Sequence, residues 1–300
     1  GARRRNSGSS VRKTALKTGK VVKSVGGVFY VFCDGRRMRL FSRKKIRLRD
    51  EVIVGDNVLF DEKERTIEKV LPRTNRLVRP PVANVDCALI FVAPSPEPDL
   101  FLADKILLNC FRQDVSPLFV VNKKDISDDA FCDRIKSNYS SAATVFCVSA
   151  LTGEGVEALK RALAGKTVCL TGQSAVGKTT LLNLLTGENM PTGDLSEKIA
   201  RGKNTTRHSE IFGAGQDTFL IDTPGFSLLD TQEIRAFELG LFYPDFAEQA
   251  PLCRFNMCTH TVEPDCAVKS AVANGRINGE RYERYAALFE QLKKAEEERF

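Results

Sequence analysis

The chain has 300 residues, of which 42% are hydrophobic and 28% are charged, a balance that excludes a largely disordered protein and leaves room for two or three globular domains. Its longest apolar runs are far too short to span a bilayer, and no signal segment opens the sequence, so we expect a cytoplasmic protein that binds no membrane. Nine cysteines, an odd number, argue against a framework of disulfides.

The net charge of +7 hides a strong asymmetry along the chain. Residues 1–79 contain 22 Lys and Arg against 8 Asp and Glu, so this segment carries +14 and the remaining 221 residues carry −7. A compact basic segment is typical of nucleic-acid binding. The alternative is a solvated basic surface without a partner.

The basic segment divides into two parts. Residues 1–17 lack apolar periodicity, which predicts a disordered arm. Residues 18–79 form short alternating segments punctuated by Gly-Gly, Asp-Gly and Gly-Asp pairs, which predicts a small all-β domain. Five short strands in this length suit a barrel of the OB type, a fold that commonly binds oligonucleotides. The expected strands are Lys20–Val25, Val28–Cys33, Arg37–Phe41, Glu51–Phe60 and Arg65–Val70.

Residues 80–242 are predicted to form an α/β domain. Continuous apolar segments alternate here with helical stretches, as in a mainly parallel sheet covered on both faces. Such a sheet is the usual setting for a phosphate-binding loop. The expected strands are Cys87–Val92, Leu118–Val121, Val145–Val148, Val168–Leu170 and Phe219–Ile221.

The first motif in this domain is Asn122-Lys123-Lys124-Asp125, directly after an expected strand. A carboxylate at Asp125 can accept hydrogen bonds from the N1–H and the 2-amino group of guanine, whereas adenine offers it an acceptor and no donor. Because an unpaired buried carboxylate is costly, the motif predicts selectivity for guanine. Ser149 and Ala150 follow the next expected strand and resemble the short loop that supports the base with a backbone amide.

The strongest local signal is a full match to G-x-x-x-x-G-K-[ST] between an expected strand and an expected helix. Backbone N–H groups and the helix N-terminus can cradle phosphates, Lys178 can reach the β- and γ-phosphates, and Thr179 can ligate Mg²⁺. A chance match in a loop is the alternative. The predicted nucleotide-binding residues are Gly172, Gln173, Ser174, Ala175, Val176, Gly177, Lys178, Thr179 and Thr180.

Asp222-Thr-Pro-Gly225 follows the last expected strand, which would place Asp222 beside this phosphate-binding loop (P-loop). Asp222 is predicted to hold Mg²⁺, through water. Gly225 offers a backbone N–H to the γ-phosphate, so this segment can sense whether that phosphate is present.

Residues 243–300 are irregular and then helical over Arg281–Glu298. Within the irregular part, Cys253, Cys258, His260 and Cys266 supply four ligands inside fourteen residues. Three thiolates and an imidazole suit tetrahedral Zn²⁺ and leave no open coordination position, which predicts one structural zinc ion. Unrelated buried thiols are the alternative.

The order of the motifs identifies a family. In ordinary small GTPases the P-loop comes first and N-K-x-D last, whereas here the guanine motif precedes the P-loop, so the order is circularly permuted. A permuted G domain between a β-barrel and a Cys/His cluster resembles the ribosome small subunit-dependent GTPase A family (RsgA, also called YjeQ). The segment Val70-Leu-Pro-Arg-Thr-Asn-Arg-Leu77 resembles that family's junction between barrel and G domain.

The resemblance implies a GTPase that is stimulated by the small ribosomal subunit and its rRNA, acts late in the maturation of that subunit, and carries the zinc site. Nucleotide state would control docking and release. We expect a monomer that binds GTP or GDP with Mg²⁺. The alternative is an RNA-binding assembly scaffold that uses GTP only as a structural ligand.

The predicted catalytic set is Lys178, Thr179, Gly225 and Thr206, with Thr206 completing the Mg²⁺ shell from the segment 202–206. Phe226 stands where many small GTPases place the glutamine that orients the attacking water, so the resemblance implies slow turnover that a partner accelerates. Asn204 replaces a family histidine and cannot act as a base, and His208 lies nearby without a defined role. We assign no general base.

Overall fold

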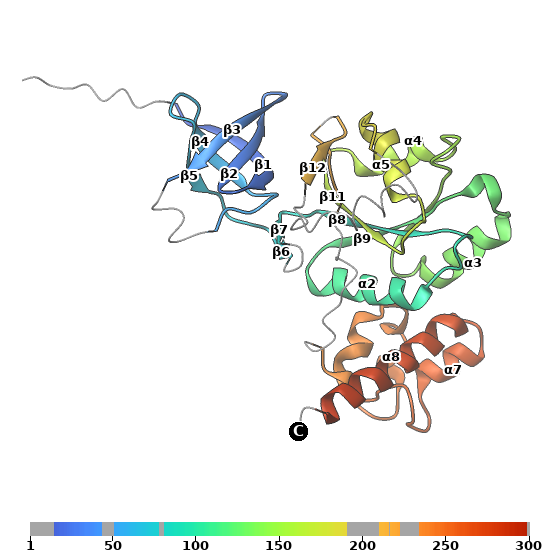
Figure 1. Cartoon of the computed structure of the whole chain (residues 1–300). Coiled ribbons are helices and arrows are strands. Elements are labelled where there is room, and N and C mark those ends of the chain that lie inside the picture. Colours follow the sequence, from blue (N-terminus) through green and yellow to red (C-terminus); the bar gives the residue numbers. More distant parts are fainter. Residues whose placement is uncertain are drawn as a thin grey trace, which may run out of the picture.

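The computed structural model describes residues 15–43, 51–77, 81–190, 210–215, 217–222 and 234–298. They form a small β-barrel, a central sheet covered by helices, and a C-terminal helical region, which Figure 1 shows in chain order from blue to red. The barrel lies beside the sheet, and the C-terminal region lies beyond helix α2 (Leu100–Arg112). No helix among the described residues is long and apolar enough to cross a membrane.

The barrel is closed by five strands in the order β1-β2-β3-β5-β4. β3 and β5 pair in parallel and the other neighbours are antiparallel, as in an OB-type barrel, so the predicted fold class of this region is confirmed. Alternate side chains point inward, and Val31, Leu40 and Phe60 fill the interior. The strands are β1 Lys17–Val25, β2 Val28–Cys33, β3 Arg36–Ser42, β4 Asn57–Asp61 and β5 Thr66–Val70.

The expected strand Glu51–Phe60 is wrong over its first half, because regular pairing begins only at β4. Val54 makes an isolated bridge, and the following residue, Gly55, has a φ of 90°. A Cβ atom on Gly55 would lie 2.0 Å from the carbonyl oxygen of Ala83. The chain therefore turns where only glycine permits both the backbone conformation and the close approach.

A short linker hairpin, β6 (Arg76–Leu77) and β7 (Val82–Ala83), connects the barrel to the sheet. Asn84, just after this hairpin, donates from Nδ2 to the carbonyl oxygen of Gly55 at 3.0 Å. Arg73, just before it, donates to the fully buried carboxylate of Asp56 at 2.6 Å. These bonds fix the linker against the barrel.

The central sheet has six strands in the order β10-β9-β8-β11-β13-β12. All neighbours pair in parallel except β12, an antiparallel edge strand that was not among the expected strands. All six residues of β8 are buried, because helices cover both faces of the sheet. The strands are β8 Cys87–Val92, β9 Ser116–Val121, β10 Thr144–Cys147, β11 Thr167–Gly172, β12 Glu210–Gly213 and β13 Phe219–Asp222.

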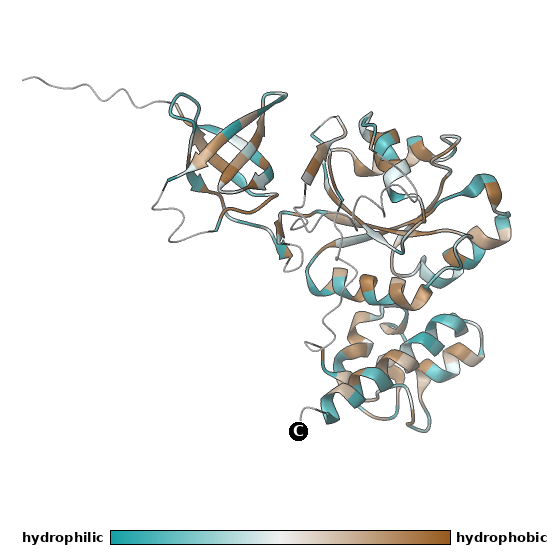
Figure 2. Cartoon of the chain, viewed as in Figure 1, coloured by the Kyte–Doolittle hydropathy of each residue, from teal (hydrophilic) through white to brown (hydrophobic). Residues whose placement is uncertain are grey.

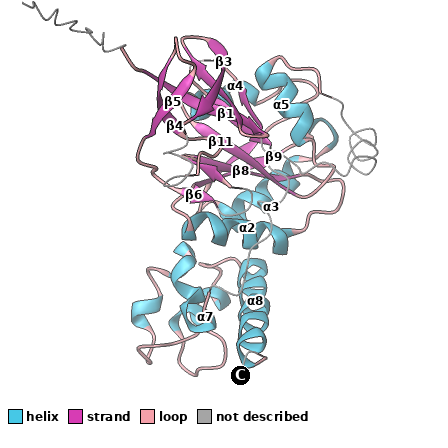
Figure 3. Ribbon diagram, turned by 60° about the vertical axis from the view of Figure 1, so that its left-hand side comes forward, coloured by secondary structure: helices cyan, strands magenta, loops and turns pink. Residues whose placement is uncertain are grey.

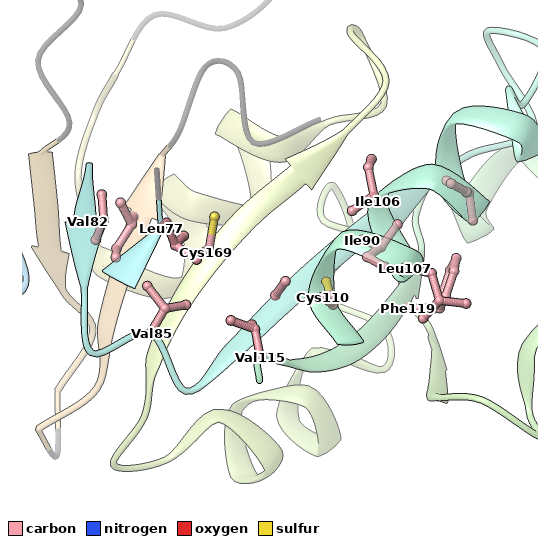
Figure 4. Packing of buried hydrophobic residues seen from close by; sticks show 14 of the residues in the cluster. Leu77, Val82, Val85, Ile90, Ile106, Leu107, Cys110, Val115, Phe119 and Cys169 are labelled. Atoms are coloured by element: carbon pink, nitrogen blue, oxygen red, sulfur yellow. The ribbon is translucent and has the colours of Figure 1, made fainter. Parts of the chain in front are cut away.

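Helices cover both faces of this sheet, as Figure 3 shows. α2 and α3 (Asp129–Tyr139) pack on one face, where Ile90, Ile106 and Phe119 belong to the largest hydrophobic cluster, part of which Figure 4 shows. α4 (Val156–Leu163) and α5 (Lys178–Thr186) pack on the other. In Figure 2 the strands between these helices are coloured as mainly hydrophobic. The predicted α/β fold class of this region is confirmed.

The barrel shares the largest cluster with the sheet. Val22 and Val54 of the barrel are buried in the same cluster as Phe219 and Ile221 of β13. The ring of Phe32 meets the ring of Phe219 edge-on, with centroids 5.5 Å apart. Apolar contact therefore continues from the sheet into the barrel.

The C-terminal region has its own hydrophobic core around Leu239, Phe246, Tyr285 and Leu288. Leu108 of α2 is buried in this core as well. Over residues 234–298, three short 3-10 helices and two α-helices build the region. They are η3 Ala236–Phe242, η4 Pro244–Phe246, η5 Ala250–Leu252, α7 Ala267–Ala273 and α8 Gly279–Glu297.

Candidate nucleotide site and metal cluster

The predicted nucleotide motifs all follow the carboxyl ends of parallel strands. Asn122 follows β9, Ser149 comes shortly after β10, Gly172 ends β11 and Asp222 ends β13. Because these strands run in the same direction and neighbour one another through β8, the motifs meet at one edge of the sheet. Ligands of open α/β sheets bind in the crevice outside this edge.

The P-loop joins β11 to α5 and uses glycine at its two ends. Gly172 has a φ of 119°, and a Cβ atom on it would lie 2.6 Å from the carbonyl oxygen of Phe91. Gly177, the N-cap of α5, has a φ of 92°, and a Cβ atom on it would lie 2.3 Å from Nδ2 of Asn122. Both positions therefore require glycine, and the loop they allow leads into the N-terminus of α5, an anion-binding position.

Ala175 lies in the left-handed region with a φ of 62°, although it is not glycine. Ser174 and Ala175 are exposed and Val176 is buried, so the loop is anchored by Val176. Thr179 and Thr180 are half-buried in the first turn of α5.

Lys178 donates from Nζ to two carbonyl oxygens of its own loop, those of Gly172 at 3.0 Å and Gln173 at 2.5 Å. Burial lowers the pKa of Lys178, and attraction to the carboxylate of Asp222 only partly opposes this. Burial likewise raises the pKa of Asp222, opposed by Lys178. The two groups thus lie close enough to influence each other, in surroundings that disfavour charge.

Asn122 connects the guanine motif to the P-loop. Its Nδ2 donates to the carbonyl oxygen of Val176 at 2.9 Å, and its Oδ1 accepts from the backbone N–H of Ala150 at 3.0 Å. The side chain is buried, with 2% exposure. One residue therefore holds three loops together, namely those of Asn122, Val176 and Ala150.

Asp125 is exposed at the same edge, and Oγ of Ser149 donates to its Oδ1 at 2.5 Å. Asp125 is therefore oriented by Ser149 and accessible from solvent. Lys124 pairs with Glu154 across the neighbouring loop, with Nζ and Oε1 2.6 Å apart.

Two side-chain contacts around the site have no signal in the sequence. Lys123 adopts a φ of 63° and donates from Nζ to the carbonyl oxygen of Ser95 at 2.7 Å. The amide of Gln173 binds the backbone of Glu97 and Asp99 in the same segment. These partners are 28 to 76 residues apart in the chain, and no local pattern marks them.

Part of the predicted site lies outside the described residues. The catalytic predictions at Thr206 and Gly225 belong to this part, as do Asn204, His208 and Phe226. They stay predictions.

The second candidate site is the cluster Cys253, Cys258, His260 and Cys266, whose ligand atoms all lie within 4.8 Å of one another. Nδ1 of His260 is 3.6 Å from Sγ of Cys253 and 3.5 Å from Sγ of Cys266, and these two sulfur atoms are 3.8 Å apart. The cluster can hold a structural metal ion, because four ligand atoms converge on one point.

Neighbouring side chains hold the loops of this cluster in place. The hydroxyl of Tyr282 donates to the carbonyl oxygen of His260 at 2.7 Å, and the hydroxyl of Tyr285 donates to that of Thr259. Burial opposes ionisation of Glu263, but hydrogen bonds from the residues flanking His260 outweigh it and lower its pKa to about 2. Both tyrosines lie on α8, so this helix supports the cluster.

Sequence comparison gives the relatives of the chain. A model of the family described as RsgA GTPase matches residues 70–232. The chain is 38% identical to the small ribosomal subunit biogenesis GTPase RsgA of Agathobacter rectalis, over 92% of this chain and 98% of that protein. It is also 38% identical to the protein of the same name from a Geobacillus species, over 93% and 98% of the two chains.

Two solved structures share the architecture. YjeQ from Thermotoga maritima aligns with a TM-score of 0.80 at 32% identity, covering 93% of this chain and 99% of that one. YloQ, described as a circularly permuted GTPase, aligns with a TM-score of 0.77 at 29% identity, covering 95% and 98%. The motif order of this chain agrees with that description.

Proposed function

The chain belongs to the RsgA GTPase family and is a GTP-hydrolysing enzyme, and from this premise we propose that it acts in late maturation of the small ribosomal subunit, docking with GTP bound and leaving after hydrolysis. The names of its relatives, which refer to biogenesis of that subunit, support the choice of partner. As an assembly enzyme it would work in the cytoplasm as a monomer.

The observation that carries the nucleotide assignment is the position of Asn122. Its two hydrogen bonds hold the P-loop and the Ser149–Ala150 loop in a fixed relation. Phosphates held by the first loop and a base held by the second would therefore lie at a set separation. A guanine nucleotide has both, and the exposed carboxylate of Asp125 would accept from its N1–H and 2-amino group.

The phosphate side would work by positioning and charge. Backbone N–H groups of the P-loop would hold the β-phosphate, and Lys178 would leave its two carbonyl partners to reach the β- and γ-phosphates. Thr179 and Asp222 would hold Mg²⁺, which neutralises charge that develops on the phosphate oxygens. The buried environment that disfavours charge on Lys178 and Asp222 would strengthen the attraction of Lys178 to the phosphates and of Asp222 to Mg²⁺.

The barrel is the proposed contact with rRNA. Arg37, Arg39 and Phe41 occupy alternate positions on β3, so their exposed side chains lie on one face. The guanidinium of Arg39 lies 5.4 Å from the centroid of the Phe41 ring. Basic side chains beside an exposed aromatic ring suit phosphate contacts and base stacking on the β2–β3 face that OB-type barrels use.

Zinc is the metal proposed for the cluster. Tetrahedral Zn²⁺, with bonds of about 2.3 Å to sulfur and about 2.0–2.1 Å to nitrogen, places two sulfur atoms about 3.8 Å apart and sulfur about 3.6 Å from nitrogen. The separations among Cys253, His260 and Cys266 are 3.8, 3.6 and 3.5 Å. The donor set and its spacing therefore fit a structural zinc ion.

The test is phosphate release from GTP and from ATP, each with and without purified small ribosomal subunits. We expect slow release from GTP alone, a many-fold increase with subunits, and little release from ATP. The Lys178→Ala variant should lose turnover under all conditions. If subunits change nothing, the ribosomal partner is wrong, and a GTP-dependent RNA scaffold becomes the better account.

A further inference from the structure

Gln173, the second residue of the P-loop, directs its side chain toward the start of α2. Its Nε2 donates to the carbonyl oxygen of Glu97, and its Oε1 accepts from the backbone N–H of Asp99, both at 3.1 Å. The two backbone partners fix which end of the amide donates. Asp99 is in turn the N-cap of α2, accepting from the N–H of Leu102 at 2.8 Å. The P-loop is thus bonded to the first turn of α2.

α2 belongs to two cores at once. Ala103, Ile106 and Leu107 are buried in the cluster that α2 forms with the central sheet. Leu108 is buried in the C-terminal core, and Phe101 packs against that core. Figures 1 and 3 both show α2 between the sheet and α8. A displacement of α2 therefore changes the packing of the C-terminal region.

Buried charges fix α8 to α2. Arg284 donates from Nε to Oδ2 of Asp104 on α2, and Arg281 lies 3.7 Å from the other oxygen of that carboxylate while also pairing with Asp245. Arg281 is 1% exposed and Asp104 is 3% exposed. A shift of α2 relative to α8 would take both arginines away from the buried carboxylate of Asp104, which is strongly unfavourable. α2 and α8 are therefore expected to move together.

Gln173 also carries a contact that nucleotide binding must change. Its carbonyl oxygen accepts from Nζ of Lys178 at 2.5 Å. In the proposed function Lys178 turns to the phosphates, so Gln173 loses this bond. The side chain of Gln173 is the one that holds the start of α2. The contact that nucleotide binding changes and the contacts that hold the start of α2 therefore belong to the same residue, Gln173.

We propose that Gln173 is a positioning residue that couples nucleotide binding at the P-loop to the orientation of the C-terminal metal-binding region through α2. The inference rests on the proposed function for the identity of the ligand. The proposed coupling runs through Gln173 and α2. It does not require residues 223–233, which follow Asp222. Because coupling is reciprocal, a change at the interface of α2 and α8 must alter nucleotide affinity.

The first test is a double-mutant cycle on the full chain, with the dissociation constant of a fluorescent GDP analogue as the readout. Gln173→Met removes both side-chain bonds at similar volume, and Arg284→Met removes the ion pair with Asp104 on α2 together with a hydrogen bond to Asn138 on α3. We expect Arg284→Met to weaken binding about fivefold in the parent chain, within the usual range of allosteric coupling, and less than twofold when Gln173→Met is present. An equal factor in both backgrounds would overturn the proposal.

Arg134→Met is the matched control. Arg134 pairs with Glu280 at 3.0 Å, which joins α3 rather than α2 to α8, and this pair is exposed. Its substitution should leave GDP affinity within twofold in both backgrounds. A weakening equal to that of Arg284→Met would mean that any loosening of α8 acts on the site, and the route through α2 would be wrong.

Hydrogen exchange keeps the proposal testable if Arg284→Met does not fold. GDP should slow exchange in residues 279–297 several-fold in the parent chain and not in Gln173→Met. Gln173→Glu, which keeps the acceptor for Asp99 and loses the donor to Glu97, should retain part of the effect. Equal slowing in the parent chain and in Gln173→Met would contradict the proposal. If the parent chain did not bind GDP at all, the proposed function itself would fail.

Discussion

The central domain holds its two neighbours by different kinds of contact. The barrel is joined by apolar side chains that continue the hydrophobic cluster of the sheet, such as Val22, Val54 and Phe32. The C-terminal region adds buried charges, with Asp104 of α2 between Arg281 and Arg284 of α8. Apolar burial is non-directional, whereas a buried ion pair is favourable in one geometry only. The barrel interface can thus tolerate small adjustments that the C-terminal interface cannot.

The two interfaces also touch different parts of the nucleotide domain. Arg37 of the barrel donates to the carbonyl oxygen of Ile211 on β12, and Phe32 contacts Phe219 on β13, the strand that ends at Asp222. The C-terminal region instead contacts α2, which Gln173 connects to the P-loop. RNA bound to the barrel would therefore act on the nucleotide site through β12 and β13. Metal bound in the C-terminal region would act on it through α2.

Loss of the metal should have the largest effect and should be confined to the C-terminal region. Cys266→Ser should abolish tight metal binding and speed hydrogen exchange in residues 267–297. Binding of structural zinc contributes about 10–16 kcal/mol to folding in zinc-finger peptides. Metal analysis and hydrogen exchange measure the two effects. Cys147→Ser, at a half-buried cysteine outside the cluster, is the control. Unchanged metal content in Cys266→Ser would refute the four-ligand cluster.

Arg281→Met should be the next most damaging change. It removes the partner of Asp245 and one of the two arginines beside Asp104, and breaking a buried pair in this way costs about 3–5 kcal/mol. Hydrogen exchange in α8 reports this free energy. The exposed pair of Arg134 with Glu280 supplies the comparison, since Arg134→Met should cost no more than about 1 kcal/mol. Similar losses in both variants would remove the distinction between the interfaces.

Phe32→Ala tests the apolar interface. A fully buried Phe→Ala change costs about 3–5 kcal/mol, and since Phe32 is only half-buried we expect about 2 kcal/mol. The loss should appear as faster exchange in the barrel strands, with α8 unchanged. Faster exchange in α8 as well would show that the two interfaces are not independent.

Arg39→Gln should have the smallest effect on stability, because Arg39 is exposed on the outer face of the barrel. Its effect should fall on RNA binding instead. Removing one phosphate contact should weaken binding to small-subunit rRNA and lower the slope of log K against log salt by about 1. An unchanged slope would place the RNA contact elsewhere on the molecule.

The sequence predicted those parts of the molecule whose structure is determined by residues close together in the chain. The P-loop and the guanine motif are short segments beside single strands, and the strand pattern of the barrel follows from alternating residues. The turn at Gly55 was missed because its cause is Ala83, which is distant in the chain. The pair of Asp104 with Arg284 spans 180 residues, and only the packing of α8 on α2 reveals it.

The central claim is that one permuted site reads guanine through Asp125 and hydrolyses the nucleotide under the control of the small subunit. The most direct test compares the parent chain with Asp125→Asn on GTP and on xanthosine triphosphate, with small subunits present. An asparagine amide can donate to the 2-oxo group that xanthine has in place of the 2-amino group. The account predicts that preference crosses over from GTP to xanthosine triphosphate and that subunits stimulate both matched pairs. An Asp125→Asn variant that still prefers GTP, or a matched pair that subunits do not stimulate, would contradict it.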